Sequence, residues 1–273
     1  MKAIEVGHKL LVGICQQGNV LEEFTTRQPT GRLRRILSNV PDGNPYKQTL
    51  AALELTVVKL GPVDHPRADM LGKLSMPDID FVNFMMTAAR HPQGIPVKTT
   101  CGYKQPDGTF EEGCGQKISA AVDPRAVEIV EGTAPVQFEA DGQQRPFQVM
   151  VFHDPELGRE VEVVMRLPLL QDQISLTAAL KTQGDALGDV ASKQFSNHML
   201  NYDKRGRGLT VAELDDLPLA TFDALFDASR KVKARQLDME VVLVCPSCGK
   251  QHTVLLPTEE WLAPFEAPAP SQS

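Results

Sequence analysis

Apolar and polar residues alternate along several short stretches of this chain, and a period of two is the pattern of a half-buried β-strand. The alternation is clearest in residues 160–165, where Val161, Val163 and Met165 occupy every second position. β-branched side chains such as valine pack well on the pleated surface of a sheet. These residues therefore predict a strand that turns Val161 and Val163 toward the core.

A second strand is expected just before this one, at residues 148–152. The two runs are separated by residues 154–158, with the sequence Asp-Pro-Glu-Leu-Gly, and turns favour Asp, Pro and Gly. Two strands joined by a short turn predict an antiparallel β-hairpin. A comparable run at residues 21–26 predicts one more strand near the start of the chain.

Helices are predicted where apolar residues recur every three or four positions. Two such segments have the apolar stripes Leu33, Ile36 and Leu37 in one case and Leu176, Ala179 and Leu180 in the other. Two further helices are expected to begin at Pro77 and Pro218, because proline fits the first helical turn, where its missing N–H costs nothing. Asp215 and Asp216 are expected to cap the second of these helices with negative charge.

Several short motifs occur twice and in the same order, which indicates two diverged copies of one unit. The paired motifs are Arg27-Gln28-Pro29 and Arg166-Leu167-Pro168, Lys47-Gln48 and Lys193-Gln194, Met76-Pro77 and Leu217-Pro218, Cys101 and Cys245, and Cys114-Gly115 and Cys248-Gly249. Any single match is common by chance, whereas matches in unbroken order are not. We predict a first copy at 1–125, a linker at 126–145, a second copy at 146–258 and a disordered, Pro- and Ala-rich tail at 259–273.

Each copy is expected to contain a strand or hairpin, then helices, then two strands that flank a pair of cysteines. The strands expected around the cysteines are residues 97–100, 118–122, 239–244 and 253–256. The predicted class is therefore α+β. Two pseudo-repeated units would be joined at a shared site that resembles a zinc ribbon.

Residues 245–249, with the sequence Cys-Pro-Ser-Cys-Gly, form the loop of a zinc knuckle. The tight turn brings two thiolates together, and one knuckle supplies two of the four ligands that a closed tetrahedral zinc site needs. Cys101 and Cys114 complete the set in our interpretation, with residues 102–113 as an insert between them. We therefore predict a structural zinc ion bound by Cys101, Cys114, Cys245 and Cys248.

Other interpretations of the cysteines stay open at the level of sequence. His252 could replace one cysteine as a ligand, the thiols could serve packing alone, and an iron–sulfur cluster also uses four thiolates. A catalytic zinc would need an open coordination position and a nearby acid or base. Glu111 and Glu112 lie on the insert, but a solvent-exposed position explains them more simply. Cys15 has no partner in this scheme and is expected to be a small buried residue.

The net charge of −7 over 273 residues disfavours broad binding to nucleic acid, because an acidic chain repels phosphate. The short basic clusters at 32–35 and 204–207 are interpreted as solvated surface. The sequence lacks the phosphate-loop, dinucleotide-binding, nucleophile-elbow and H-E-x-x-H motifs, so we expect no enzyme and no small-molecule substrate. It has no apolar run of about 18 residues and no signal peptide, so we expect no membrane association and a cytoplasmic protein.

The Leu/Met-Pro helix start, the following strand, the Cys-Pro-x-Cys-Gly loop and the upstream Arg-x-Pro motif together resemble the T-even phage baseplate hub assembly proteins of contractile-tailed phages and prophages. The residues that carry this resemblance are Arg166–Pro168, Leu217-Pro218, Phe222 and Cys245–Gly249, and in the first copy Arg27–Pro29, Met76-Pro77, Cys101 and Cys114-Gly115. The resemblance spans most of residues 20–258. The wide spacing of Cys101 and Cys114 departs from a plain knuckle.

This resemblance implies a non-enzymatic assembly factor, acting as a chaperone or baseplate component, that binds other phage tail and hub proteins. It would act in the cytoplasm of the infected bacterium or in the virion tail. The main alternative is a zinc-ribbon regulatory protein that binds nucleic acid, which the acidic charge disfavours. A third alternative, a metal-dependent hydrolase, lacks acid and base residues at motif spacing.

Overall fold

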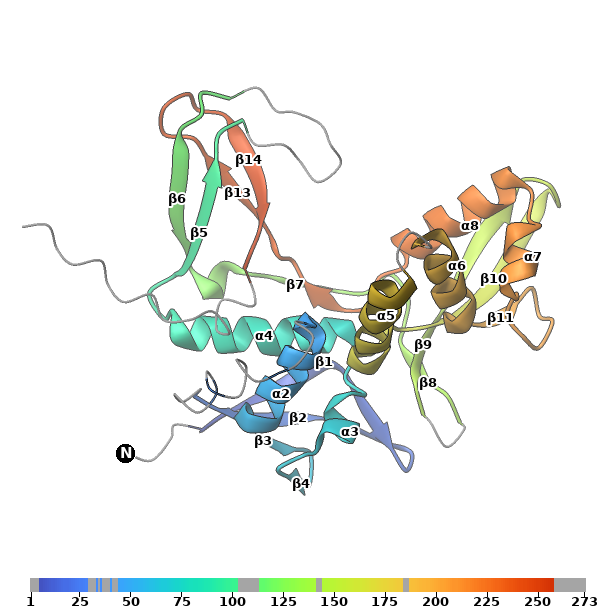
Figure 1. Ribbon diagram of the computed structural model, residues 1–273, viewed down its shortest axis with the longest axis horizontal. Helices are drawn as coiled ribbons and strands as arrows, with labels where there is room; N and C mark the ends of the chain where they lie inside the picture. Colours follow the sequence, from blue (N-terminus) through green and yellow to red (C-terminus); the bar gives the residue numbers. More distant parts are fainter. Residues whose placement is uncertain are drawn as a thin grey trace, which may run out of the picture. The chain divides into compact units, whose positions relative to one another are not determined.

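The computed structural model describes residues 5–28, 33, 35, 40, 44–102, 113–140, 144–183 and 187–257. These residues form a mixed α+β protein with seven helices and several small antiparallel sheets (Figure 1), which confirms the predicted α+β class. The chain divides into two compact units. The first unit comprises residues 1–79 and 131–236, and the second unit comprises residues 80–130 and 237–273.

One antiparallel sheet of the first unit has the strand order β1-β2-β3-β4. Its strands are β1 (Glu5–Gln16), β2 (Asn19–Arg27), β3 (Val57–Leu60) and β4 (Val63–Asp64). The run at 21–26 is a strand as predicted, whereas β1 was missed. The apolar pattern of β1 is interrupted at Lys9 and Gly13. The register with β2 shifts between Lys9 and Ile14, and Gly13 has a positive φ of 86° there.

Asp78 holds this irregular part of β1 in place. Its buried carboxylate accepts hydrogen bonds from the backbone N–H groups of Leu11, Val12 and Gly13 at 2.8, 2.9 and 3.0 Å. The hydroxyl of Ser75 also donates to it, at 2.9 Å. Since buried polar groups need partners, the bulge of β1 and the start of helix α4 (Met76–Arg90) both depend on the Asp78 side chain.

Three of the seven described helices lie where the sequence predicted helices, at 76–90, 170–183 and 219–231, whereas the other four were not predicted. The seven helices are α2 (Pro45–Thr56), α3 (Ala68–Leu71), α4 (Met76–Arg90), α5 (Leu170–Gln183), α6 (Leu187–His198), α7 (Val211–Asp215) and α8 (Leu219–Lys231). Helix α4 contains Pro77 near its start, and Pro218 is the N-cap of α8, as the proline positions predicted. Of the predicted stripe of Leu33, Ile36 and Leu37, only Leu33 lies among the described residues, and it is buried.

The second sheet of the first unit has the order β11-β10-β9-β8. Its strands are β8 (Gln137–Phe138), β9 (Pro146–Asp154), β10 (Arg159–Arg166) and β11 (Met199–Tyr202). Strands β9 and β10 confirm the predicted hairpin. Asp154 stabilises its turn by accepting the N–H groups of Glu156 and Leu157 at 2.9 and 3.1 Å.

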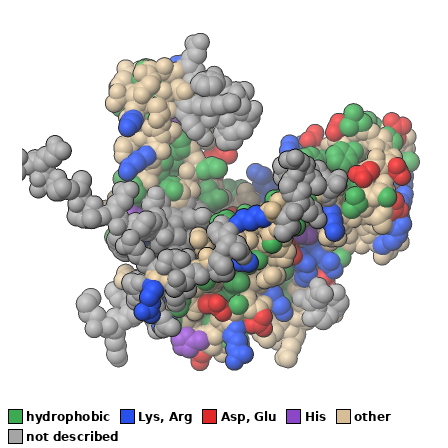
Figure 2. All heavy atoms as spheres, in the orientation of Figure 1, with side chains coloured by type: hydrophobic (Ala, Val, Ile, Leu, Met, Phe, Trp, Pro, Cys, Tyr) green, Lys and Arg blue, Asp and Glu red, His purple; other side chains and the backbone are tan. Residues whose placement is uncertain are grey.

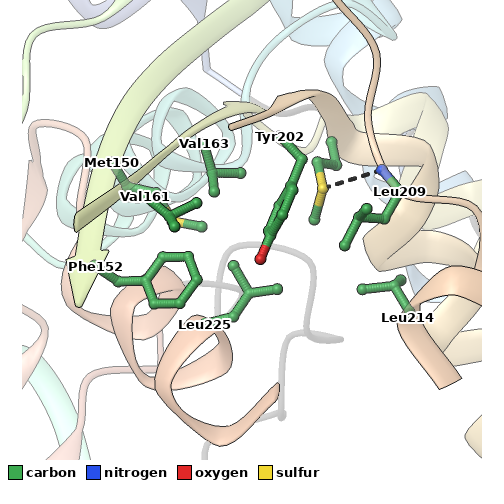
Figure 3. Packing of buried hydrophobic residues seen from close by; sticks show 9 residues of the cluster. Met150, Phe152, Val161, Val163, Tyr202, Leu209, Leu214 and Leu225 are labelled. Atoms are coloured by element: carbon green, nitrogen blue, oxygen red, sulfur yellow. Dashed lines mark hydrogen bonds between the residues drawn. The ribbon is translucent and has the colours of Figure 1, made fainter. Parts of the chain in front are cut away.

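One face of this sheet carries a core of buried apolar side chains (Figure 3). Val161 and Val163 are completely buried there, as the alternating pattern predicted. The members of the cluster are Met150, Phe152, Val161, Val163, Met199, Tyr202, Leu209, Leu214 and Leu225. Leu225 belongs to α8, so burial of this apolar surface holds α8 against the sheet.

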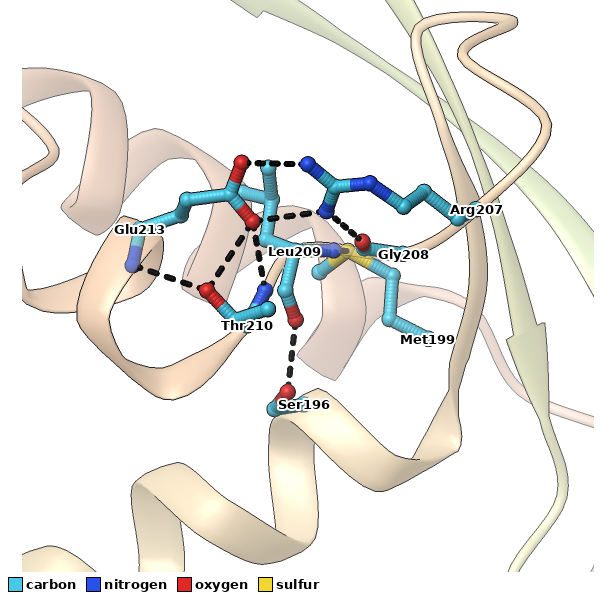
Figure 4. A network of polar contacts seen from close by, with 7 residues as sticks. All are labelled: Ser196, Met199, Arg207, Gly208, Leu209, Thr210 and Glu213. Carbon is cyan, nitrogen blue, oxygen red and sulfur yellow. Dashed lines mark hydrogen bonds and ion pairs between the residues drawn. The ribbon is translucent and has the colours of Figure 1, made fainter.

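Helix α7 is fixed by a polar network at its start (Figure 4). Thr210 and Glu213 form a capping box, and Arg207 donates two hydrogen bonds of 2.7 Å to the Glu213 carboxylate. Hydrogen bonds from Arg207 and Thr210 hold the pKa of Glu213 well below its usual value. The prediction that Asp215 and Asp216 cap α8 was wrong: Asp215 ends α7 and Asp216 is its C-cap, because a turn intervenes before α8.

The second unit contains two short antiparallel hairpins. Strand β5 (Ile95–Thr100) pairs with β6 (Lys117–Val122), and β13 (Glu240–Val244) pairs with β14 (Gln251–Leu255). These are the four strands predicted around the cysteines. A 3-10 helix, η2 (Pro124–Ala126), follows β6, and β7 (Ile129–Val130) pairs with β12 (Gln236–Leu237).

The two compact units cut across the predicted copies at 1–125 and 146–258, because each unit contains segments of both. The division into copies stays a prediction about the sequence. The predicted linker, 126–145, contains strands β7 and β8, and the predicted tail at 259–273 lies outside the described residues. None of the helices in the described part of the chain combines the length and apolar character needed to cross a bilayer.

Replacing Asp78 with alanine is expected to lower the free energy of unfolding by about 3 kcal/mol, because three buried backbone N–H groups lose their acceptor. The exposed Asp64 provides the control, and Asp64→Ala should change stability by less than about 0.5 kcal/mol. Chemical denaturation of both variants measures the difference. Equal stability of the two variants would show that Asp78 does not hold β1.

Candidate metal centre

The loop after β13 folds as a knuckle around Cys245. Cys245 donates its backbone N–H to the Lys250 carbonyl at 2.8 Å, and its own carbonyl accepts the N–H of Gly249 at 2.9 Å. Gly249 has a φ of +74°, a conformation that glycine adopts without steric cost. The loop therefore brings Cys245 and Cys248 onto one side of the turn.

The loop after β5 repeats this geometry around Cys101. Cys101 donates its backbone N–H to the Gln116 carbonyl at 2.8 Å, and its carbonyl accepts the N–H of Gly115 at 3.0 Å. Gly115 has a φ of +73°, within one degree of the value at the matching glycine of the other loop. Cys101 and Cys114 are therefore arranged as a knuckle despite their separation in sequence.

Two glycines close the base of the insert between Cys101 and Cys114. A Cβ atom added to Gly113 would lie 2.1 Å from the backbone nitrogen of Gly102, a distance that only overlapping atoms would show. The chain therefore leaves and re-enters the knuckle at adjacent points. Residues 103–112, which include Glu111 and Glu112, lie outside the described residues.

The two knuckles bring four sulfur atoms together within the second unit. The Sγ atom of Cys101 lies 3.5 Å from that of Cys248, and the Sγ atom of Cys114 lies 3.6 Å from that of Cys245. All four Sγ atoms lie within 4.8 Å of one another. A tetrahedral ion with metal–sulfur bonds of about 2.3 Å would hold its sulfurs about 3.8 Å apart, so the arrangement fits one ion.

The ligand set combines buried and accessible thiols. Cys101 and Cys245 are buried, whereas Cys114 and Cys248 are exposed. Four sulfur donors fill a tetrahedral coordination sphere and leave no position for a substrate or a water molecule. A metal ion bound by these four thiolates would therefore be structural, and it would tie one hairpin of the second unit to the other.

Two of the thiols have pKa values that are shifted in opposite directions. The backbone N–H of Cys114 lowers the pKa of the Cys101 thiol, but burial and hydrogen bonds with the Cys248, Cys114 and Cys245 thiols outweigh it and raise the pKa to about 12. Burial raises the pKa of Cys245, yet hydrogen bonds from the backbone of Cys248 and Ser247 and from the Cys114 and Cys248 thiols lower it to about 6. Cys245 therefore ionises more readily than Cys101.

Two other residues considered from the sequence lie outside this cluster. His252 is buried on β14 opposite Leu243 and does not belong to the group of converging ligand atoms. Cys15 is half-buried on β1 in the first unit, so it is more accessible than predicted. The role of Gly113 could not be predicted from the sequence, because glycine is required there by the closeness of two backbone segments.

Comparison of this chain with protein-family models, with curated proteins and with solved structures finds no match.

The four-cysteine site predicts one tightly bound divalent ion per chain. Native mass spectrometry of the purified protein should show one zinc ion, and Cys101→Ser and Cys248→Ser should each lose it, because one variant removes a ligand from each knuckle. Cys15→Ser is the matched control and should keep the ion. Retention of zinc by both ligand variants would contradict a site shared between the knuckles.

Metal binding should release protons, because the ligands bind as thiolates. The Cys101 thiol, with its raised pKa, must give up a proton near neutral pH when a metal binds. The affinity is therefore expected to fall by at least about tenfold for each unit of pH below neutrality. Competition with a chromophoric chelator across a pH series measures this slope, and a pH-independent affinity would contradict thiolate ligation.

Proposed function

We propose that this chain is a non-enzymatic assembly protein or component of the baseplate of a contractile phage tail, and that its four cysteines bind a structural zinc ion. The observation that carries the proposal is the pair of matched knuckles at Cys101 and Cys245. The resemblance to baseplate hub assembly proteins rests on motifs that include these knuckles. The protein would act by binding other tail and hub proteins.

The order of elements supports a duplicated unit, which is part of this proposal. One half of the chain runs β1-β2-α2-β3-β4-α3-α4-β5-β6, and the other runs β9-β10-α5-α6-β11-α7-α8-β12-β13-β14, with β12 as an additional short strand. In both halves a hairpin pairs with a third strand through its second strand. Both halves then end in a hairpin that carries a knuckle, so the two copies follow nearly the same course.

The motifs that carry the resemblance occupy equivalent places in the two halves. Arg27 is the last residue of β2, and Arg166 is the last residue of β10. Pro77 is the second residue of α4, and its counterpart Pro218 is the N-cap of α8. Short motifs that match by chance have no reason to fall at the same ends of equivalent elements, so this agreement supports the proposal.

Zinc is favoured over an iron–sulfur cluster by the separation of the sulfur atoms. In a cluster the cysteines bind different iron atoms, so their sulfurs lie farther apart than around one ion. A span of 4.8 Å for all four Sγ atoms suits a single tetrahedral ion. Binding of zinc to such a site contributes on the order of 10 kcal/mol to folding, which would stabilise two small hairpins with little core of their own.

The surface of the β13–β14 hairpin favours a protein partner over nucleic acid. The outer face of β13 and β14 exposes Val242, Val244 and Leu255 at 59%, 56% and 66%. The other side chains in the same rows are Glu240, Gln251 and Thr253, which provide no cation for a phosphate backbone. On the face drawn in Figure 2, acidic and basic side chains are also interspersed around α7 and α8.

Deleting the gene for this chain from its phage or prophage is expected to abolish complete tails, because the baseplate would not assemble. Electron microscopy of the lysate measures this, and the wild-type chain and Cys15→Ser should both restore tails. Cys101→Ser should fail to do so. Affinity capture of the wild-type chain from the same cells should recover tail or hub proteins.

Normal, infectious tails in the deletion strain would overturn the proposal. Retention of DNA or RNA with a steep dependence on salt, and without tail proteins, would instead support the nucleic-acid-binding alternative.

A further inference from the structure

Strand β9 has an outer edge that is largely unpaired. Strand β10 pairs with one edge of β9 from Phe147 to Asp154 without any shift of register. On the other edge, β8 pairs only with Pro146 and Phe147. Among the described residues, the outer edge of β9 from Gln148 onward therefore has no neighbouring strand.

The direction of the backbone groups on β9 follows from two hydrogen bonds. Leu167 donates its N–H to the carbonyl of Pro146, and Gly158 donates its N–H to the carbonyl of Asp154. Even-numbered residues of β9 therefore point their backbone groups toward β10. Because these directions alternate along a strand, the N–H and C=O groups of Val149, Val151 and His153 point outward.

Two of the three residues that carry these outward groups are exposed. The side chains of Val151 and His153 are exposed, with Val151 at 53%. Among the described residues, no backbone hydrogen bond joins Val151 or His153 to a segment beyond β10. A row of unpaired donors and acceptors on an exposed strand is a template for another strand.

A groove of about 610 Å³ lies beside this edge, between β9 and α8. Met150 and Phe152 line it from the strand, Ala224 and Ala228 line it from the helix, and Val232 lines it from the helix C-cap. The last three residues are four positions apart and therefore share one face. Their side chains are small or short, which leaves room in the groove for larger apolar side chains.

Hydrogen bonds at both ends of α8 hold this groove in shape. At the start of the helix, the Thr221 hydroxyl donates to the Asp154 carboxylate at 2.9 Å. Beyond its end, Thr133 donates its N–H to the carbonyl of Lys233 at 2.9 Å, and Lys233 donates its N–H to the Thr133 hydroxyl at 2.8 Å. The side-chain amide of Gln148 donates to the carbonyls of Ala134 and Lys233 at 2.6 and 3.2 Å. The groove is therefore preformed.

We propose that this groove binds an extended segment of a partner protein by β-strand addition along Val149–His153. The unpaired backbone groups call for a peptide backbone, which neither a lipid nor a small apolar molecule supplies. In a strand beside β9, alternate side chains point into the groove. The segment is therefore expected to carry bulky apolar residues at every second position, packed against Ala224, Ala228 and Val232.

The groove carries one acidic and one basic residue of α8, Asp227 and Lys231, so its charge favours a segment with little net charge. The inference is independent of the proposed function and of the metal, because every residue in it belongs to the first unit. Loss of the zinc site or of the phage phenotype would leave it standing, and its failure would leave them standing.

Val151→Pro tests the proposal by removing one backbone N–H group, that of residue 151. Proline is tolerated on a strand edge where the N–H faces solvent, so the variant removes an outward donor and spares the pairing with β10. Val151→Thr, which keeps the N–H, is the matched control. Random peptides selected by mRNA display against the full-length wild-type chain serve as the probe. The enriched peptides should have alternating apolar residues and should bind Val151→Pro about tenfold more weakly or worse, and Val151→Thr unchanged.

Ala228→Trp gives a second test, because it fills the groove without touching the strand edge. It should abolish binding of the same peptides, and the amides of Val151 and His153 in the wild-type chain should exchange hydrogen more slowly when a peptide is bound. Circular dichroism checks that each variant is folded. Three outcomes would each overturn the proposal: failure to enrich any peptide, binding by the Val151→Pro and Ala228→Trp variants as tight as that of the wild-type chain, or dimers of the chain that Val151→Pro dissociates.

Discussion

The convergence of four thiols from two knuckles is the interaction on which the second unit depends. Among the described residues, β5–β6 and β13–β14 are each two-stranded, and a two-stranded hairpin is marginally stable in water. Each knuckle positions its sulfurs by the same pair of backbone hydrogen bonds and the same left-handed glycine. A shared ion would convert two weak hairpins into one stable structure, because metal binding contributes free energy comparable to that of a whole domain.

Much of this arrangement could be predicted because it depends on local chemistry. The turn at 154–158, the prolines at the starts of α4 and α8 and the Cys-Pro-x-Cys-Gly loop each act over a few residues, and the sequence displays them directly. Strand β1 was missed because its bulge, held by the distant Asp78 carboxylate, breaks the alternation on which strand prediction relies. Asp215 and Asp216 were misassigned because the short helix α7 ends only a few residues before α8 begins, so the same residues could belong to either helix end.

The compact units and the binding edge could not be predicted for a different reason. A sequence repeat suggests contiguous copies, whereas compactness depends on which distant segments bury each other's surface. Segments 131–236 and 1–79 therefore form one unit, although the repeat divides them. The unpaired edge of β9 likewise follows from the shortness of β8, which no pattern of apolar residues in β9 indicates. Knuckle and edge lie in different units, so metal binding and partner binding can be examined separately.

X-ray absorption spectroscopy at the zinc edge tests the central claim most directly, because it counts and identifies the atoms around the ion. The geometry of the two knuckles predicts four sulfur neighbours at about 2.3 Å and no lighter ligand in the first shell. A first shell that includes nitrogen or oxygen at about 2.0–2.1 Å would contradict a closed four-thiolate centre. An absence of bound zinc in protein purified without chelators would contradict it as well.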